Sequence, residues 1–116
     1  MLIHELAETA GVSIDTIRFY EKRGLLDKAH FQRKANHYRD YTEAAVSRLR
    51  LIQQGQAAGL TLAEMCRYIQ AWESEQLTID EKMEFFERKI EEIDARIAQL
   101  EQVKVYLYQK LRMMDQ

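Results

Sequence analysis

The segment TIRFYEKRGLL, from Thr16 to Leu26, decides the fold of this 116-residue chain. Serine favours the N-cap of a helix and glycine favours its end, so Ser13 and Gly24 delimit a predicted helix over residues 14–23. Three cations and two adjacent aromatic side chains share this short helix. A basic, aromatic helix in a chain with a net charge of −2 indicates a local surface for a polyanion.

A second short helix is predicted directly upstream. Four apolar side chains recur there at the spacing of one helical face, and a glycine follows them as a C-terminal cap: Ile3, Leu6, Ala7, Ala10 and Gly11. Two short helices joined by a tight glycine turn predict a helix-turn-helix unit.

The composition argues against several classes of protein. No apolar run exceeds four residues, so neither a transmembrane helix nor a signal peptide is expected, and no membrane partner. The single cysteine rules out an internal disulfide and fits a reducing cytoplasm. Charge is unevenly placed: residues 13–39 carry seven Lys/Arg against three acids, and residues 51–116 carry eight against twelve.

The middle of the chain predicts a hairpin and two helices. Residues 27–41 break the helical period and are rich in cations, which favours a small hairpin with a basic tip. Thr42 is expected to cap a helix that runs to about residue 58. Thr61 with Glu64 forms a capping box that opens a further helix to about residue 72.

A second capping box, Thr78 with Glu81, opens the longest predicted element. Eleven positions step by alternating fours and threes, and ten of them are apolar, which is a heptad pattern. At ~1.5 Å per residue this helix is about 54 Å long, too long for a small domain to cover, so a homodimer is expected. The predicted seam contains Ile79, Met83, Phe86, Ile90, Ile93, Ile97, Leu100, Lys104, Leu107, Leu111 and Met114.

The one polar seam residue, Lys104, bears on the direction of pairing. A parallel, in-register pair would face Lys104 with its own copy inside the seam, where two desolvated like charges are unfavourable. In an antiparallel pair that crosses near Ile97, Lys104 meets the region around Ile90, which is flanked by acids. An antiparallel coiled coil is therefore predicted. The alternative is that Lys104 lies where the coil frays and says nothing about direction.

With this order of elements, the chain resembles the MerR family of bacterial transcriptional regulators over essentially its whole length. The resemblance rests on IHELA (residues 3–7), GVS (11–13), TIRFYE (16–21), GLL (24–26), NHYRDY (36–41), LI (51–52) and GLTLAE (59–64). It implies a mostly α fold: a winged helix-turn-helix DNA-binding domain with two further helices over residues 1–75, followed by a coiled-coil dimerisation helix over residues 76–116.

The resemblance also implies partners and contacts. A homodimer would bind a two-fold-related site in double-stranded promoter DNA and distort it, and so act indirectly on RNA polymerase. For Tyr20, core packing against the first helix is an equal alternative to a DNA contact. The predicted DNA-binding residues are Ser13, Thr16, Arg18, Phe19, Tyr20, Arg23, Arg33, Lys34, Asn36, Tyr38 and Arg39.

No effector can be named from the sequence, and the resemblance is to a compact member without an effector domain. No cofactor is expected, and no metal site, because no residues have zinc-ligand spacing and no cysteine follows Cys66. Cys66 shares a helical face with apolar residues, so a small buried hydrophobe is the favoured interpretation, and a sensor of oxidants or electrophiles is the alternative.

Three classes of function compete. A dimeric DNA-binding regulator explains the basic front, the acidic remainder and the heptads together. A coiled-coil interaction module without specific DNA binding explains only the last third. An enzyme is not expected, because there is no phosphate-binding loop, nucleophile motif or pair of carboxylates suited to catalysis.

Overall fold

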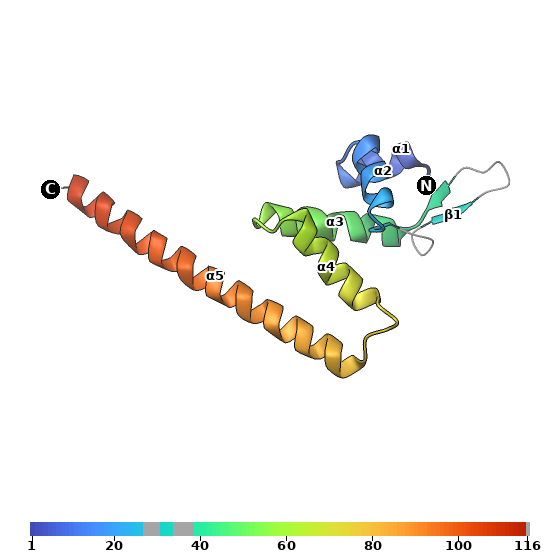
Figure 1. The fold of residues 1–116 in the computed structure, drawn as a ribbon. Coiled ribbons are helices and arrows are strands. Elements are labelled where there is room, and N and C mark those ends of the chain that lie inside the picture. Colours follow the sequence, from blue (N-terminus) through green and yellow to red (C-terminus); the bar gives the residue numbers. More distant parts are fainter. Residues whose placement is uncertain (27–30, 34–38, 116) are drawn as a thin grey trace. The chain divides into compact units, whose positions relative to one another are not determined.

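The computed structural model describes residues 1–26, 31–33 and 39–115. The chain falls into two compact units, Met1–Gln70 and Ala71–Gln116. The domain boundary that the sequence predicts after residue 75 falls between the last two helices. The elements, drawn in Figure 1, are α1 (Ile3–Ala10), α2 (Ile14–Lys22), β1 (Phe31–Arg33), β2 (Arg39–Tyr41), α3 (Glu43–Ala57), α4 (Leu62–Glu73) and α5 (Ile79–Met114).

The helix-turn-helix prediction is confirmed. α1 ends at Gly11, whose φ of 71° lies in the left-handed region that glycine adopts without strain. The hydroxyl of Ser13 then accepts a hydrogen bond from the Thr16 N–H at 3.0 Å, so Ser13 is the N-cap of α2. Gly24, with a φ of 75°, ends the second helix in the same way as Gly11 ends the first.

The predicted hairpin is present as a two-stranded antiparallel sheet. Phe31 lies opposite Tyr41 in the register, and Arg33 lies opposite Arg39. The residues between the strands, 34–38, lie outside the described residues. β2 therefore returns the chain from the hairpin to the start of α3.

Two side chains of α3 hydrogen-bond to the backbone of the helix-turn-helix unit. Arg48 Nη1 donates to the Leu25 carbonyl at 2.7 Å, and Gln53 Nε2 donates to the Ala10 carbonyl at 2.9 Å. Ala10 is the last residue of α1 and Leu25 lies three residues beyond the end of α2, so these side chains satisfy backbone carbonyls outside the helical hydrogen bonding. The core around them contains Leu6, Ala10, Ile17, Tyr20, Leu25, Leu26, Tyr41, Ala45, Val46, Leu49, Ile52, Cys66 and Ile69.

α3 and α4 meet at a glycine. A Cβ on Gly55 would lie 2.9 Å from Cε of Met65 and closer still to its sulfur, so a larger residue at this position would require the Met65 side chain to move. Met65 is 3% exposed. The predicted capping box at the start of α4 is confirmed: Thr61 Oγ1 accepts from the Glu64 N–H, and Glu64 Oε1 accepts from the Thr61 N–H, each at 3.1 Å.

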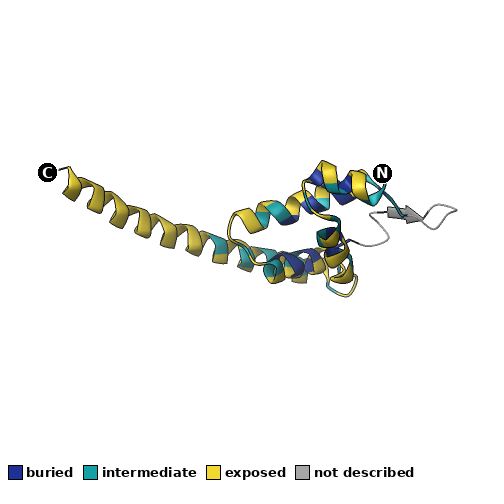
Figure 2. Cartoon of the chain, turned by 90° about the horizontal axis from the view of Figure 1, so that it is seen from above, coloured by how far each residue is buried: buried dark blue, intermediate teal, exposed yellow. Residues whose placement is uncertain are grey.

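The second unit is dominated by α5, whose 36 residues include none that is buried. The Thr78–Glu81 capping box that starts it is confirmed, with both hydrogen bonds at 3.1 Å. Figure 2 shows the helix exposed along almost its whole length. Within the described ranges no helix combines the length and apolar content needed to cross a membrane. The large seam residues that are exposed are Ile79, Met83, Ile90, Ile97, Leu100, Leu107, Leu111 and Met114, while Phe86 and Ile93 are half-buried.

The Gly55–Met65 contact generates a stability prediction. Gly55→Leu should lower the free energy of unfolding by about 1–3 kcal/mol, because the larger side chain overpacks a closed site. Urea denaturation at a fixed protein concentration measures the change. Ala57→Leu, on an exposed position of the same helix, is the matched control and should change little. Adding Met65→Ala to Gly55→Leu should recover part of the loss, and a Gly55→Leu midpoint equal to that of the parent would contradict this account.

Candidate nucleic-acid interface

α2 presents different side chains on its two faces. Ile17 and Tyr20 face the core and are buried, whereas Arg18 is exposed and Phe19 is 45% exposed. The Arg23 guanidinium lies 5.1 Å from the centre of the Phe19 ring, a cation–π arrangement that limits the motion of both side chains. The outward face of α2 thus offers a flat aromatic ring and two guanidinium groups to a partner.

The first turn of α2 adds two hydroxyl groups to the same element. Ser13 Oγ and Thr16 Oγ1 lie 2.8 Å apart, and Ser13 is exposed. Helix N-termini and small hydroxyls are frequent partners of phosphate oxygens. The predicted residues Ser13, Thr16, Arg18, Phe19 and Arg23 are therefore brought together on one helix.

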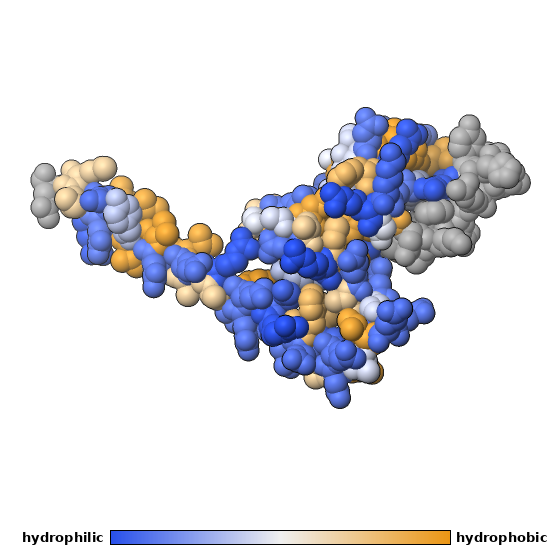
Figure 3. Space-filling view, viewed as in Figure 1, coloured by the Kyte–Doolittle hydropathy of each residue, from blue (hydrophilic) through white to orange (hydrophobic). Residues whose placement is uncertain are grey.

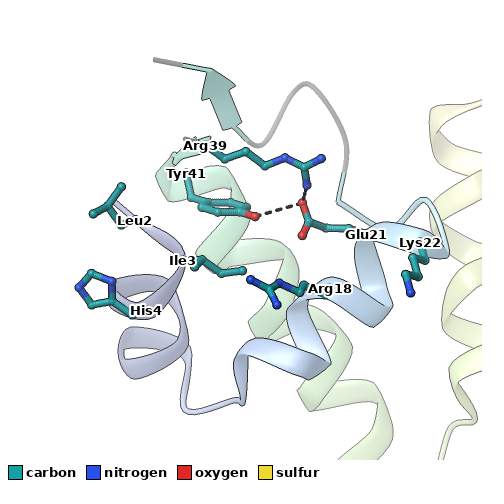
Figure 4. Close-up of a pocket in the computed structure, with 8 residues that line it drawn as sticks. All are labelled: Leu2, Ile3, His4, Arg18, Glu21, Lys22, Arg39 and Tyr41. Atoms are coloured by element: carbon teal, nitrogen blue, oxygen red, sulfur yellow. Dashed lines mark hydrogen bonds and ion pairs between the residues drawn. The ribbon is translucent and has the colours of Figure 1, made fainter. Parts of the chain in front are cut away.

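A hollow of about 630 Å³ lies between α1, α2 and β2. Figure 4 shows the Arg18 side chain at this hollow, with the Tyr41 ring on the opposite wall. Four of its lining residues are Arg, Lys or His, and one is acidic. The lining consists of Leu2, Ile3, His4, Arg18, Glu21, Lys22, Arg39 and Tyr41.

The single acid in the hollow, Glu21, joins α2 to the hairpin. Its carboxylate accepts a hydrogen bond from Tyr41 Oη at 3.0 Å and forms an ion pair with the Arg39 guanidinium (Figure 4). The Glu21 side chain is 10% exposed, whereas that of Arg39 is 35% exposed. The guanidinium is thus anchored by a largely buried acid and remains accessible at the surface.

Sequence reasoning did not assign a role to Glu21. The available signal was an acid placed among cations on a predicted reading helix, where it reduces attraction for a polyanion. The sequence could not show that the hairpin returns to this side of α2 and brings Arg39 and Tyr41 to the carboxylate.

β2 is also tied to the start of the chain. The Met1 ammonium donates to Asp40 Oδ1 at 2.6 Å and to the Tyr41 carbonyl at 2.8 Å, and the Tyr41 N–H donates to the Met1 carbonyl at 2.7 Å. These bonds continue the backbone pairing of β2 on the side away from β1. The strand that carries Arg39 is therefore held on both sides.

The two buried tyrosines remain neutral. Burial raises the pKa of Tyr41, opposed in part by the positive charges of Arg39 and Arg18. Burial likewise raises the pKa of Tyr20. A neutral Tyr41 keeps the proton that it donates to Glu21.

The burial of Tyr20 bears on the two alternatives that the sequence leaves open for this residue. Its side chain is only 6% exposed, and its hydroxyl donates to Gln56 Oε1 at 3.3 Å. A side chain so placed packs α2 against α3 and offers little surface to DNA. The packing alternative is therefore favoured for Tyr20, because helical periodicity turns it to the same side as Ile17.

The remaining predicted contacts fall on the hairpin. Arg39 reaches the hollow, as described above. Arg33 lies on β1, where its backbone is opposite that of Arg39. Lys34, Asn36 and Tyr38 lie outside the described residues.

Cys66, the alternative sensor, belongs to the core. It is 8% exposed and clusters with apolar residues of the first unit, which favours the packing interpretation of this thiol. Among residues 1–26, 31–33 and 39–115, no group of three or more His, Cys, Asp or Glu side chains is arranged to hold a metal ion.

Comparison with known proteins agrees with this arrangement. The family described as "MerR HTH family regulatory protein" matches residues 1–72, and the one described as "MerR, DNA binding" matches residues 46–109. The mercuric resistance operon regulatory protein of Bacillus cereus is 32% identical over 102 residues, which are 88% of this chain and 76% of that protein.

Solved structures show the same architecture. A MerR family transcriptional regulator from Listeria monocytogenes superposes with a TM-score of 0.81 at 25% identity, covering 100% of this chain and 86% of the other. HiNmlR, a MerR family regulator lacking the sensor domain and bound to promoter DNA, superposes with a TM-score of 0.60 at 28% identity, covering 88% and 76%. The chain, with its helix-turn-helix, its hairpin and its long terminal helix, belongs to the MerR family of helix-turn-helix regulatory proteins.

Proposed function

We propose that this protein is a homodimeric transcriptional regulator that binds a two-fold-related site in promoter DNA. One observation carries the proposal: the exposed Arg18 of α2 lines the same hollow as Arg39 of β2, which Glu21 anchors there. Phosphate contacts position a protein on a duplex, and a cationic helix beside a cationic strand suits two stretches of one DNA backbone.

We infer the mode of action from the MerR family. Each copy would place α2 in a major groove, and the two grooves would lie about 34 Å apart on one side of the duplex. Distortion of the promoter would then change how RNA polymerase engages it. HiNmlR, a MerR family regulator whose structure contains promoter DNA, supports DNA binding as part of this proposal. A cytoplasmic location and the absence of catalytic activity belong to the same proposal.

The residues proposed to contact DNA differ in their roles. Arg18 can donate two hydrogen bonds to a guanine edge or to a phosphate, and Phe19 can contact an apolar base edge. Arg39 would hold the backbone beside the groove. Other members of the proposed contact set are Ser13, Thr16, Arg23, Arg33, Lys34, Asn36 and Tyr38.

The distribution of charge along α5 supports antiparallel pairing of two copies. Residues 79–96 carry seven acids and four Lys/Arg, whereas residues 97–114 carry one acid and three Lys/Arg. An antiparallel pair sets the acidic half of each helix against the basic half of the other, while a parallel pair sets like against like. Single surface pairs are weak, but the orientation depends on the difference between the two arrangements.

Removal of Arg18 should weaken DNA binding. Arg18→Ala is expected to lose about 1–3 kcal/mol of binding free energy and to reduce sequence preference at the base that Arg18 reads. Fluorescence anisotropy with a labelled promoter fragment, repeated at several salt concentrations, measures both effects. Arg67→Ala, which removes an exposed cation from α4, is the control. If Arg18→Ala binds the promoter fragment with the affinity and sequence preference of the parent, α2 is not the helix that contacts the bases.

Removal of Glu21 should also weaken DNA binding, although the change removes a negative charge. Glu21→Ala removes the ion pair that positions Arg39, so the protein should lose about 1 kcal/mol of affinity, and the salt slope should fall as it does in Arg39→Ala. In an Arg39→Ala background, Glu21→Ala should have little further effect.

Two comparisons make the Glu21 result specific. Glu8→Ala removes an exposed acid from α1 and should not lower affinity. If Glu21→Ala binds DNA more tightly than the parent, the carboxylate competes with phosphate for Arg39 and does not position it. Equal losses in both backgrounds, with a lower melting temperature, would reduce Glu21 to a purely structural role.

The direction of pairing can be tested by cross-linking. In a Cys66→Ala background, Ile90→Cys with Lys104→Cys should form an intermolecular disulfide readily, because an antiparallel pair crossing near Ile97 brings these positions together. Lys104→Cys alone should cross-link poorly. Non-reducing electrophoresis after mild oxidation gives the yields, and ready cross-linking of the Lys104→Cys single variant would indicate a parallel pair.

A further inference from the structure

The hollow between α1, α2 and β2 has an apolar wall as well as a cationic one. Leu2, which precedes α1, and Ile3, its first residue, are half-buried and line the hollow. Figure 4 shows these two side chains on one side of the hollow and those of Glu21 and Lys22 on the other. Charged and polar groups hold a phosphodiester backbone, and apolar side chains add nothing to that contact. The proposed contact with DNA therefore leaves the apolar wall without a role.

The rest of the lining carries more positive than negative charge. Arg18, Lys22 and Arg39 are permanent cations and Glu21 is the one acid, which leaves a net charge of +2 on these four residues. The Glu21 carboxylate is already bonded to Arg39 and to the Tyr41 hydroxyl, so its charge is largely offset. A ligand with a single negative charge would therefore be attracted to the hollow.

One of the cations is held in place before any ligand arrives. The ion pair with Glu21 restrains the Arg39 side chain, 35% of which remains accessible. Such restraint lowers the entropic cost of binding. A guanidinium is a planar fork that can donate two parallel hydrogen bonds to a carboxylate, so this group suits a carboxylate ligand.

The hollow also has the size of a small-molecule site. Its volume of about 630 Å³ lies within the range of ~300–1,000 Å³ that is usual for ligand pockets. Such pockets combine apolar side chains with a few polar groups that fix the orientation of the ligand. The hollow has both, on different walls.

We propose that the hollow binds a small carboxylic acid with an apolar body, and that this ligand and DNA exclude each other. The carboxylate would accept hydrogen bonds from Arg18 or Arg39, and the apolar body would lie against Leu2 and Ile3. The exclusion rests on the proposed function, because the same two guanidinium groups are proposed to contact DNA. The ligand would then release the promoter directly, by occupying part of the DNA-binding surface.

Octanoate is the probe for this site, because it joins a carboxylate to a flexible apolar chain. Isothermal titration calorimetry with the full chain should show saturable binding. Two matched compounds separate the contributions of the two walls: octan-1-ol lacks the charge, and inorganic phosphate lacks the apolar body. Each should bind at least about tenfold more weakly than octanoate, because each can use one wall only.

Leu2→Ser tests the location of the site. It shortens the apolar wall, and serine favours the N-cap position that Leu2 occupies, so α1 should not be weakened. The octanoate dissociation constant should rise about three- to tenfold, while DNA affinity stays close to that of the parent. Leu51→Ser, which removes an exposed leucine from α3, is the matched control and should change neither value.

The same variant excludes uptake of the probe at another apolar surface. Figure 3 shows such surface gathered toward the C-terminal end of α5, where Leu107, Leu111 and Met113 are exposed. Octanoate bound there would be unaffected by Leu2→Ser. Weaker binding in this variant therefore assigns the probe to the hollow.

Fluorescence anisotropy with a labelled promoter fragment measures the exclusion. At an octanoate concentration equal to its dissociation constant, the apparent dissociation constant for DNA should rise at least about twofold, and it should keep rising in proportion as octanoate is added. A ligand that acts from a separate site would give an effect that reaches a plateau. Sodium chloride keeps the ionic strength constant, because DNA binding depends on salt.

The outcomes separate this proposal from the proposed function. A parent protein that binds promoter DNA, but binds octanoate no better than inorganic phosphate, would overturn the site and leave the function standing. Octanoate binding that Leu2→Ser does not weaken would overturn it as well. A plateau, or DNA affinity unchanged by bound octanoate, would overturn the exclusion. If the protein binds no promoter DNA, the proposed function fails, and calorimetry with Leu2→Ser still decides whether the site exists.

Discussion

A helix of 36 residues with an apolar stripe cannot bury that stripe against itself. This constraint shapes the rest of the molecule, because α5 contributes no buried residue and so adds nothing to the core of a single chain. The first unit must be stable on its own packing, and it has a closed core contributed by α1, α2, α3, α4 and β2. A first unit that folds on its own core leaves the apolar stripe of α5 available for pairing with a second copy, as a protein that binds a two-fold-related site needs.

Within the first unit, the positions of the helices are fixed by side chains that hydrogen-bond to backbone groups. Arg48 and Gln53 of α3 bind the carbonyl of Leu25, after α2, and that of Ala10, at the end of α1, and each bond joins segments far apart in sequence. Such bonds resist sliding of one helix on another because a displaced carbonyl would be left unpaired. The position of α2 is therefore fixed both by its packing in the core and by these hydrogen bonds.

The net negative charge of the chain and the basic surface of α2 are compatible because the charges lie in different places. Cations of α2 and β2 gather at one hollow, whereas acids predominate in the first half of α5, where residues 79–96 carry seven acids and four Lys/Arg. Glu21 is the exception within the basic region, and its two partners explain why an acid is placed there. The sequence shows that charge is unevenly distributed along the chain. The fold gathers the cations of α2 and β2 at one hollow, and the first half of α5 presents an acidic surface.

Local sequence signals were sufficient to predict many of the secondary-structure elements of this protein. Gly11, Ser13 and Gly24 determined the helix-turn-helix because caps and left-handed glycines act over a few residues, and the Thr78–Glu81 capping box determined the start of α5 for the same reason. Only the tertiary structure decided that Tyr20 packs inward, that Met65 fills the space over Gly55, and that Glu21 receives Tyr41 and Arg39. These contacts join residues 10 to 36 positions apart, and no periodicity or cap encodes which side chain will meet a returning strand or helix.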